Sequence, residues 1–126
     1  MNTETFVKYL NERLERTVKV LAHKRKEYVY TDNPMQNFED AVGISIVRTR
    51  EGVAYSYLVK HIQSAVGIIE YLELHGKVPH DAELIREKFG DIINYFIIIE
   101  AMLLERFDEQ NPGIPVNIGL DDEDGE

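Results

Sequence analysis

The sequence predicts an all-α fold, built as a bundle of three long helices and one short helix. Apolar residues recur every three or four positions along most of the 126-residue chain, which is the period of an amphipathic helix. No segment shows the strict alternation of apolar and polar residues that is typical of a half-buried strand. We expect a single domain over residues 1–108 and an irregular acidic tail over residues 109–126.

The first long helix is expected over about residues 3 to 28, because its apolar residues share one helical face. These apolar residues are Phe6, Leu10, Leu14, Val18 and Leu21. The stretch VYTDNPMQNFED then interrupts the pattern with Asp, Asn and Pro, which favour turns. A short helix is expected next, over about residues 38 to 46.

Two further long helices are expected over about residues 53 to 74 and about residues 82 to 107. Gly76 is suited to end the first of them, Pro79 cannot continue it, and Asp81 is suited to begin the second. Because the connection is short, the two helices should be antiparallel neighbours.

The last helix is apolar on nearly every side from Phe89 onward, which is typical of a central helix. One small domain can hardly cover such a helix by itself. We therefore expect part of it to contact another copy of the chain in a homo-oligomer, a dimer or larger. The alternative is that the other three helices cover it alone.

The composition restricts the classes of function. The net charge is −9, and the final stretch DDEDGE holds five of the acids. An acidic surface argues against duplex nucleic acid as a partner, because binding to it requires a basic stripe. The absence of cysteine excludes thiolate chemistry and suggests a reducing compartment. No uncharged apolar stretch reaches membrane-spanning length, and the N-terminal segment is charged throughout. We therefore expect a cytoplasmic protein without a membrane partner.

Carboxylates at helical spacing indicate a candidate metal site. Glu83, Glu87 and Asp91 are spaced by four residues, while Glu70 and Glu73 are three apart on the preceding helix. Antiparallel packing would allow the two sets to face each other, and clustered carboxylates require a cation between them. Mg²⁺ is the expected ion, since it prefers oxygen ligands and keeps water molecules that a phosphate can replace.

Two plainer interpretations stay open for these acids. Carboxylates at this spacing often form only a solvated helix face. Asp91, which lies among apolar neighbours, would alternatively form a structural salt bridge with Lys60 or Arg86.

The segment EKFGDIINYFIIIEAML resembles the final metal-binding helix of the all-α nucleoside triphosphate pyrophosphohydrolases, the MazG-like and dimeric dUTPase-like superfamily. That superfamily carries E-x-x-E on one helix and E-x-x-D on the next. This chain has Glu70-x-x-Glu73 and then Glu87-x-x-x-Asp91, with Lys88 where the superfamily has an acid.

The chain is still more similar to a group of small phage and prophage proteins linked to nucleotide modification. That group shows four short patterns in order: K-x-E/D-Y, N-F, K-H-I and E-K-x-x-D-x-x-N-Y. The corresponding residues here are Lys26-Glu27-Tyr28, preceded by Lys24 and Arg25, then Asn37-Phe38, Lys60-His61-Ile62 and the segment from Glu87-Lys88 to Asn94-Tyr95.

The resemblance implies a nucleotide-binding protein with Mg²⁺-dependent hydrolysis of nucleoside triphosphates to a monophosphate and pyrophosphate. It implies Glu87 and Asp91 as catalytic residues, acting with water as the nucleophile. The implied metal ligands are Glu70, Glu73, Glu87 and Asp91. The implied substrate-binding residues are Lys26, Tyr28, Asn37, Phe38, Lys60 and Tyr95.

Whether the chain is an enzyme stays open at this point, and Lys88 is the feature that favours a non-catalytic alternative. On that alternative the chain is a phage-derived module that binds a nucleotide or a host factor without hydrolysis, for which an acidic helical surface is suited. A third interpretation is a purely structural helical oligomer, with Glu87 and Asp91 in salt bridges.

Overall fold

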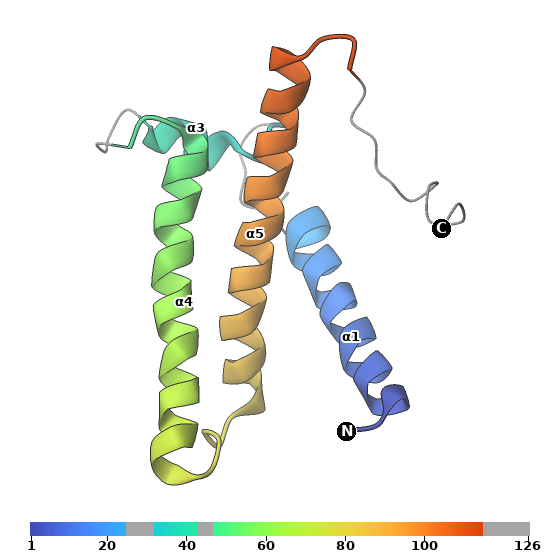
Figure 1. Cartoon of the computed structure of the whole chain (residues 1–126), viewed down its shortest axis with the longest axis vertical. Helices are drawn as coiled ribbons and strands as arrows, with labels where there is room; N and C mark the ends of the chain where they lie inside the picture. Colours follow the sequence, from blue (N-terminus) through green and yellow to red (C-terminus); the bar gives the residue numbers. More distant parts are fainter. Residues whose placement is uncertain (25–31, 43–46, 115–126) are drawn as a thin grey trace.

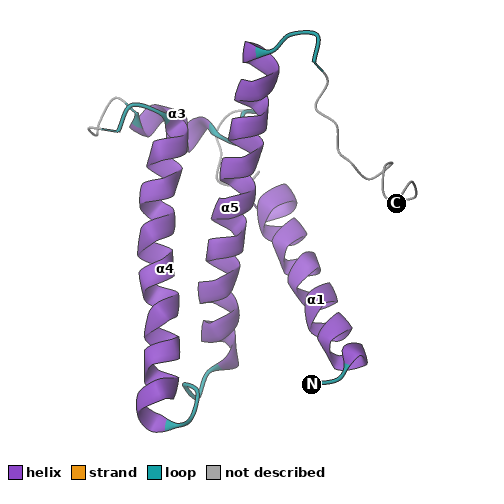
Figure 2. Cartoon of the chain, in the orientation of Figure 1, coloured by secondary structure: helices purple, strands orange, loops and turns teal. Residues whose placement is uncertain are grey.

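A computed structural model describes residues 1–24, 32–42 and 47–114 of the chain. Over these ranges the chain is helical and contains no strand, so the all-α prediction is confirmed (Figure 2). The elements are, in chain order, α1 (Thr3–Val18), the π-helical segment η1 (Lys19–Lys24), α3 (Gln36–Ala41), α4 (Arg50–His75) and α5 (Ala82–Gln110).

The predicted helices agree with these elements except at their ends. The first was expected over about residues 3 to 28, but α1 ends at Val18 and the chain continues as η1, while residues 25–28 lie outside the described ranges. The short helix begins two residues earlier than expected and ends at Ala41, and residues 43–46 lie outside the described ranges. Helix α4 begins about three residues earlier and ends one residue later than expected, and α5 begins where expected and ends about three residues later.

Helices α4 and α5 form a long antiparallel hairpin whose connection follows the predicted capping residues (Figure 1). Gly76 ends α4 in the left-handed conformation, with φ of 68°, and its N–H donates to the carbonyl of Leu72 at 2.8 Å. The Asp81 carboxylate begins α5 by accepting from the backbone N–H groups of Glu83 and Leu84 at 3.0 and 3.2 Å.

The core lies where α3 meets the first turns of α4 and the second half of α5. Its buried members are Phe38, Val53, Ala54, Ile98 and Met102. This core is small for the chain, and many large apolar side chains of α1, α4 and α5 are exposed.

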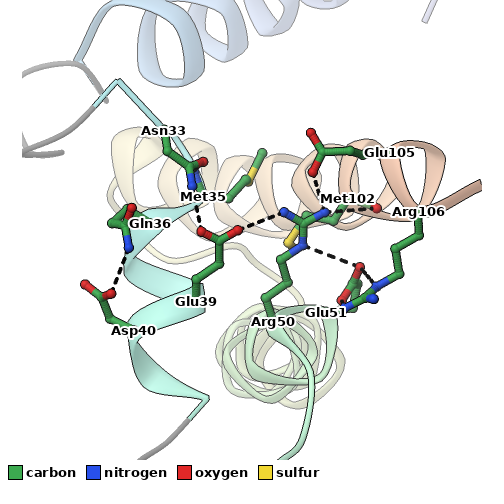
Figure 3. A network of polar contacts seen from close by, with 10 residues as sticks. All are labelled: Asn33, Met35, Gln36, Glu39, Asp40, Arg50, Glu51, Met102, Glu105 and Arg106. Atoms are coloured by element: carbon green, nitrogen blue, oxygen red, sulfur yellow. Dashed lines mark hydrogen bonds and ion pairs between the residues drawn. The ribbon is translucent and has the colours of Figure 1, made fainter. Parts of the chain in front are cut away.

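A network of charged side chains links α3, α4 and α5 beside the core (Figure 3). The Arg50 side chain, only 11% exposed, pairs with Glu39 on α3 at 3.1 Å and with Glu105 on α5 at 2.7 Å. Its guanidinium also donates to the carbonyl of Met102 at 3.3 Å. Arg106 pairs with Glu51, which adds a second link between α4 and α5.

Helix α1 runs beside the first half of α5, on the opposite side from α4 (Figure 1). Arg13 donates to the carbonyl of Arg86 at 2.8 Å, and Arg16 pairs with Glu83 at 2.7 Å. Gly90 makes this contact close, because a Cβ at that position would lie 2.6 Å from Nη1 of Arg13.

The predicted apolar face of α1 is exposed in this arrangement. Its residues are between 43% and 57% exposed at Phe6, Leu10, Leu14 and Val18. Helix α5 lies between α4 and α1, yet side chains such as Phe96 and Leu103 remain more than half exposed. The described helices therefore do not cover α5 by themselves, and the expected contact with another copy stays a prediction.

Candidate functional site

The two predicted catalytic acids, Glu87 and Asp91, line one cleft between α1 and α5. The cleft has a volume of about 510 Å³, within the range of small-molecule sites. Helix α5 contributes Glu87, Asp91 and Asn94, which follow one another at four and three residues and therefore share a helical face. The lining residues from the N-terminal elements are Arg13, Glu15, Arg16, Lys19 and Val20.

Asn94 is the most unusual side chain of the cleft. It is only 9% exposed, and its Oδ1 atom is buried without a hydrogen-bond partner among the described residues. An unsatisfied buried acceptor costs about 1–3 kcal/mol, so such atoms are rare unless a ligand, water or ion completes them. Because Asn94 also lines the cleft, a donor or cation bound there is a suitable partner for this atom, which is otherwise shielded from solvent.

Sequence reasoning did not select Asn94 as a site residue, although it is part of the last matched pattern. The available signal was a polar amide three residues after Asp91, inside an apolar helical run. That spacing places both side chains on one face of the helix.

Asp91 also lies close to a side chain of α4. Its Oδ2 atom lies 3.4 Å from Nδ1 of His61, whose ring stacks on Tyr95 with centroids 5.0 Å apart. The salt-bridge interpretation named Lys60 or Arg86 as the partner, and the structure gives His61 instead. The Asp91 side chain is 43% exposed, so its charge is not buried in the apolar run that surrounds it in the sequence.

Charges of both signs meet at the mouth of the cleft. The hydrogen bond from Arg16 holds the pKa of Glu83 below its ordinary value, and the same bond raises the pKa of Arg16. Glu83 is thus ion-paired with Arg16, and its Oε2 atom also lies 3.5 Å from Nη1 of Arg86. Arg13 and Lys19 form no ion pair among the described residues, so their charges remain available to a ligand.

A second, open cavity of about 350 Å³ lies between α4 and α5 and brings together two predicted substrate-binding residues, Lys60 and Tyr95. Lys88, which stands in place of the superfamily acid, lines the same cavity with His61. None of the described carboxylates lines this cavity, so it is suited to an anionic group. Its full lining is Tyr57, Lys60, His61, Ser64, Lys88 and Tyr95.

The other predicted site residues that the structure describes do not join either cavity. Phe38 is buried in the core with its ring edge-on to Tyr95 at 6.1 Å, and Asn37 is exposed on α3. Glu70 and Glu73 are exposed on α4 and do not line the cleft. Lys26 and Tyr28 lie outside the described residues.

Within the described ranges, no three histidine or carboxylate side chains come together as a metal site. The cleft is lined by four carboxylates, of Glu15, Glu83, Glu87 and Asp91, and by the amide of Asn94, and Glu83 is paired with Arg16. Nor is any helix there long and apolar enough to cross a membrane.

Scans against protein-family models, curated proteins and solved structures found no match to this chain.

Proposed function

We propose that the chain binds a nucleoside triphosphate together with Mg²⁺ in the cleft between α1 and α5. The observation that carries this proposal is the buried, unpartnered Oδ1 of Asn94, which lines the same cavity as Glu87 and Asp91. Mg²⁺ commonly uses one or two carboxylates and completes its octahedron with water and substrate phosphates. A set of two carboxylates and one amide oxygen fits that requirement.

The remaining charges of the cleft suit a polyphosphate. Arg13 and Lys19 have no carboxylate partner among the described residues and can contact phosphate oxygens. Nδ1 of His61 lies 3.4 Å from Oδ2 of Asp91, and such a neighbour of a metal-binding carboxylate can help to orient it. Bound Mg²⁺ supplies neutralisation of phosphate charge and Lewis acidity.

The resemblance to the pyrophosphohydrolases favours hydrolysis as the reaction. In that reaction a water oxygen attacks the α-phosphorus, the bond from this phosphorus to the bridging oxygen breaks, and pyrophosphate leaves. Glu87 is exposed and forms no ion pair among the described residues, so its carboxylate is free to accept the proton of the water.

Calorimetric titration of nucleoside triphosphates, with and without Mg²⁺, tests the binding. We expect heat of binding with Mg²⁺ and a loss of about tenfold or more in affinity for Asp91→Asn and for Asn94→Leu. Glu100→Gln is the matched control, because it removes an exposed carboxylate from the same helix outside the cleft. Equal affinity in all three variants would disprove the site.

Release of pyrophosphate from a panel of ribo- and deoxyribonucleoside triphosphates then tests hydrolysis. We expect turnover in the native chain and its loss in Glu87→Gln and Asp91→Asn. A double variant, Glu70→Gln with Glu73→Gln, should retain turnover if these exposed acids take no part.

The second candidate function is nucleotide binding without hydrolysis. It is favoured by the separation of Glu70 and Glu73 from the cleft and by the basic cavity that contains Lys60, His61 and Lys88. Tight binding together with the absence of pyrophosphate release on the whole panel would select it. A search for a protein partner, such as a host factor, would then be the next step.

We also propose that the working form is a homo-oligomer in which a second copy covers the exposed apolar face of α1. A stable interface buries about 800 Å² on each partner and needs a largely apolar centre. The four exposed apolar side chains on that face offer such a centre on one copy.

A further inference from the structure

A small hollow adjoins the α1–α5 cleft on the side nearer the chain's N-terminus. It has a volume of about 260 Å³ and is bounded by aromatic and aliphatic side chains as well as by charges. Its lining residues are Tyr9, Glu12, Arg13, Arg16, Ile85, Arg86 and Phe89. The volume lies below the range of about 300–1,000 Å³ that is usual for a complete ligand site. The hollow is therefore suited to one part of a larger ligand.

Three arginines belong to both the hollow and the cleft. Arg13, Arg16 and Arg86 line each of the two cavities, and of the three only Arg13 forms no ion pair among the described residues, because Glu83 pairs with Arg16 and Arg86. Arg13 is positioned there by its hydrogen bond to the Arg86 carbonyl and by its close packing against the backbone at Gly90. A ligand that passes from the hollow to the cleft must cross these guanidinium groups.

Two aromatic rings remain open in the hollow. Tyr9 is 53% exposed and Phe89 is 36% exposed, and neither pairs with another aromatic ring in the part of the chain that the structure describes. Aromatic faces and planar guanidinium groups are the surfaces on which flat, conjugated rings stack. The chemical class that matches both features is a planar heterocycle joined to a chain of negative charges.

We propose that the hollow holds the nucleobase of the nucleotide whose phosphates lie in the cleft. The proposal rests on the proposed function and adds the base subsite to it, with Tyr9 and Phe89 as the stacking residues. The order along the ligand is then base at Tyr9 and Phe89, phosphates beside Arg13, and cation at Glu87, Asp91 and Asn94. Tyr28 and Tyr95, the tyrosines implied by the resemblance, are not the base platform in this arrangement.

The experiment compares two ligands that differ only in the base and sugar. Inorganic triphosphate and a purine nucleoside triphosphate are titrated separately into the full chain with Mg²⁺. For Tyr9→Ala we expect affinity for the nucleotide to fall about tenfold, since one base–aromatic stack contributes about that much, while affinity for inorganic triphosphate stays within about twofold. Tyr9→Phe should restore nucleotide affinity, because it keeps the ring.

Tyr55→Ala is the matched control, since Tyr55 is an exposed tyrosine on α4 that lines none of these cavities. Unchanged nucleotide affinity in Tyr9→Ala, or an equal fall for both ligands, would overturn the base subsite. A fall in molar mass of Tyr9→Ala by light scattering would overturn it as well, because the hollow would then be an interface between copies. If neither ligand binds the native chain, the proposed function itself fails.

Discussion

At the scale of single residues, Arg50 joins more of the structure than any other side chain in the described network. One guanidinium group meets carboxylates from α3, α4 and α5 and a backbone carbonyl of α5 (Figure 3). Burial opposes the charge of Arg50, yet its hydrogen bonds to Glu105 and Glu39 raise its pKa overall. The side chain therefore stays charged at all ordinary pH values.

Replacement of Arg50 by methionine should destabilise the protein markedly. The substitution keeps an unbranched apolar stem but removes the cation that Glu39 and Glu105 share, and it leaves Glu51 with Arg106 alone. We expect a loss of about 2–4 kcal/mol in the free energy of unfolding, measured by denaturant titration. Arg48→Met is the control, because Arg48 is a nearby exposed arginine that forms no ion pair among the described residues. A loss no greater than that of the control would contradict a structural role for the network.

The same network should make stability depend on acid pH through Glu51. Burial by itself would raise the pKa of Glu51, but the hydrogen bond from Arg106 and the neighbouring positive charges lower it overall. An acid with a lowered pKa in the folded state stabilises the protein above its unfolded value of 4.5, and that contribution is lost as the pH falls through the folded value.

The check is the unfolding free energy measured from about pH 6 down to about pH 3. The native chain should lose stability below about pH 4.5, and Glu51→Gln should show a shallower decline while being less stable at pH 6. Parallel curves for the two proteins would contradict this assignment.

At the scale of the elements, the attachment of α1 to α5 depends on a glycine. A Cβ at position 90 would displace the Arg13 guanidinium and break its bond to the Arg86 carbonyl. Gly90→Ala also gains about 1 kcal/mol of helix propensity, which offsets the lost hydrogen bond of similar size. We therefore expect nearly unchanged global stability but faster amide hydrogen exchange throughout α1.

Gly67→Ala on α4 is the matched substitution, since no atom lies within 4 Å of the Cβ it would introduce. It should raise the free energy of unfolding by about 0.5–1 kcal/mol and leave exchange in α1 unchanged. Faster exchange in both variants would show that the α1–α5 contact does not depend on position 90.

The elements also differ in how far the sequence predicts them. The C-terminus of α4 and the N-terminus of α5 follow from local chemistry at Gly76 and Asp81, which acts within four residues along the chain. The presence of Glu87 and Asp91 in one cleft likewise follows from their spacing on one helix. Two other contacts depend on the rotation and register of separate helices. These are the pairing of Asp91 with His61 and the packing of Arg13 against Gly90. A periodic pattern does not encode these quantities.

At the scale of the whole molecule, the balance between buried and exposed apolar side chains predicts self-association. Light scattering should give a mass at least twice that of one chain. Leu14→Glu places a charge in the middle of the exposed face of α1 and should lower the mass to that of a monomer. Lys8→Glu, on the polar side of α1, changes the charge more and should leave the mass unaltered. A monomeric native chain would contradict the proposed oligomer.

Helix α1 presents its polar side to the cleft and its apolar side to the surroundings, and only a few polar contacts fix its position on α5. Ligand binding on the polar side of α1 and self-association on its apolar side would each immobilise the helix, so either one lowers the entropic cost of the other. Nucleotide affinity should then rise with protein concentration, and added nucleotide should promote assembly by the same factor, because such coupling is reciprocal. The weak attachment of α1 would thus make nucleotide affinity depend on the concentration of the protein itself.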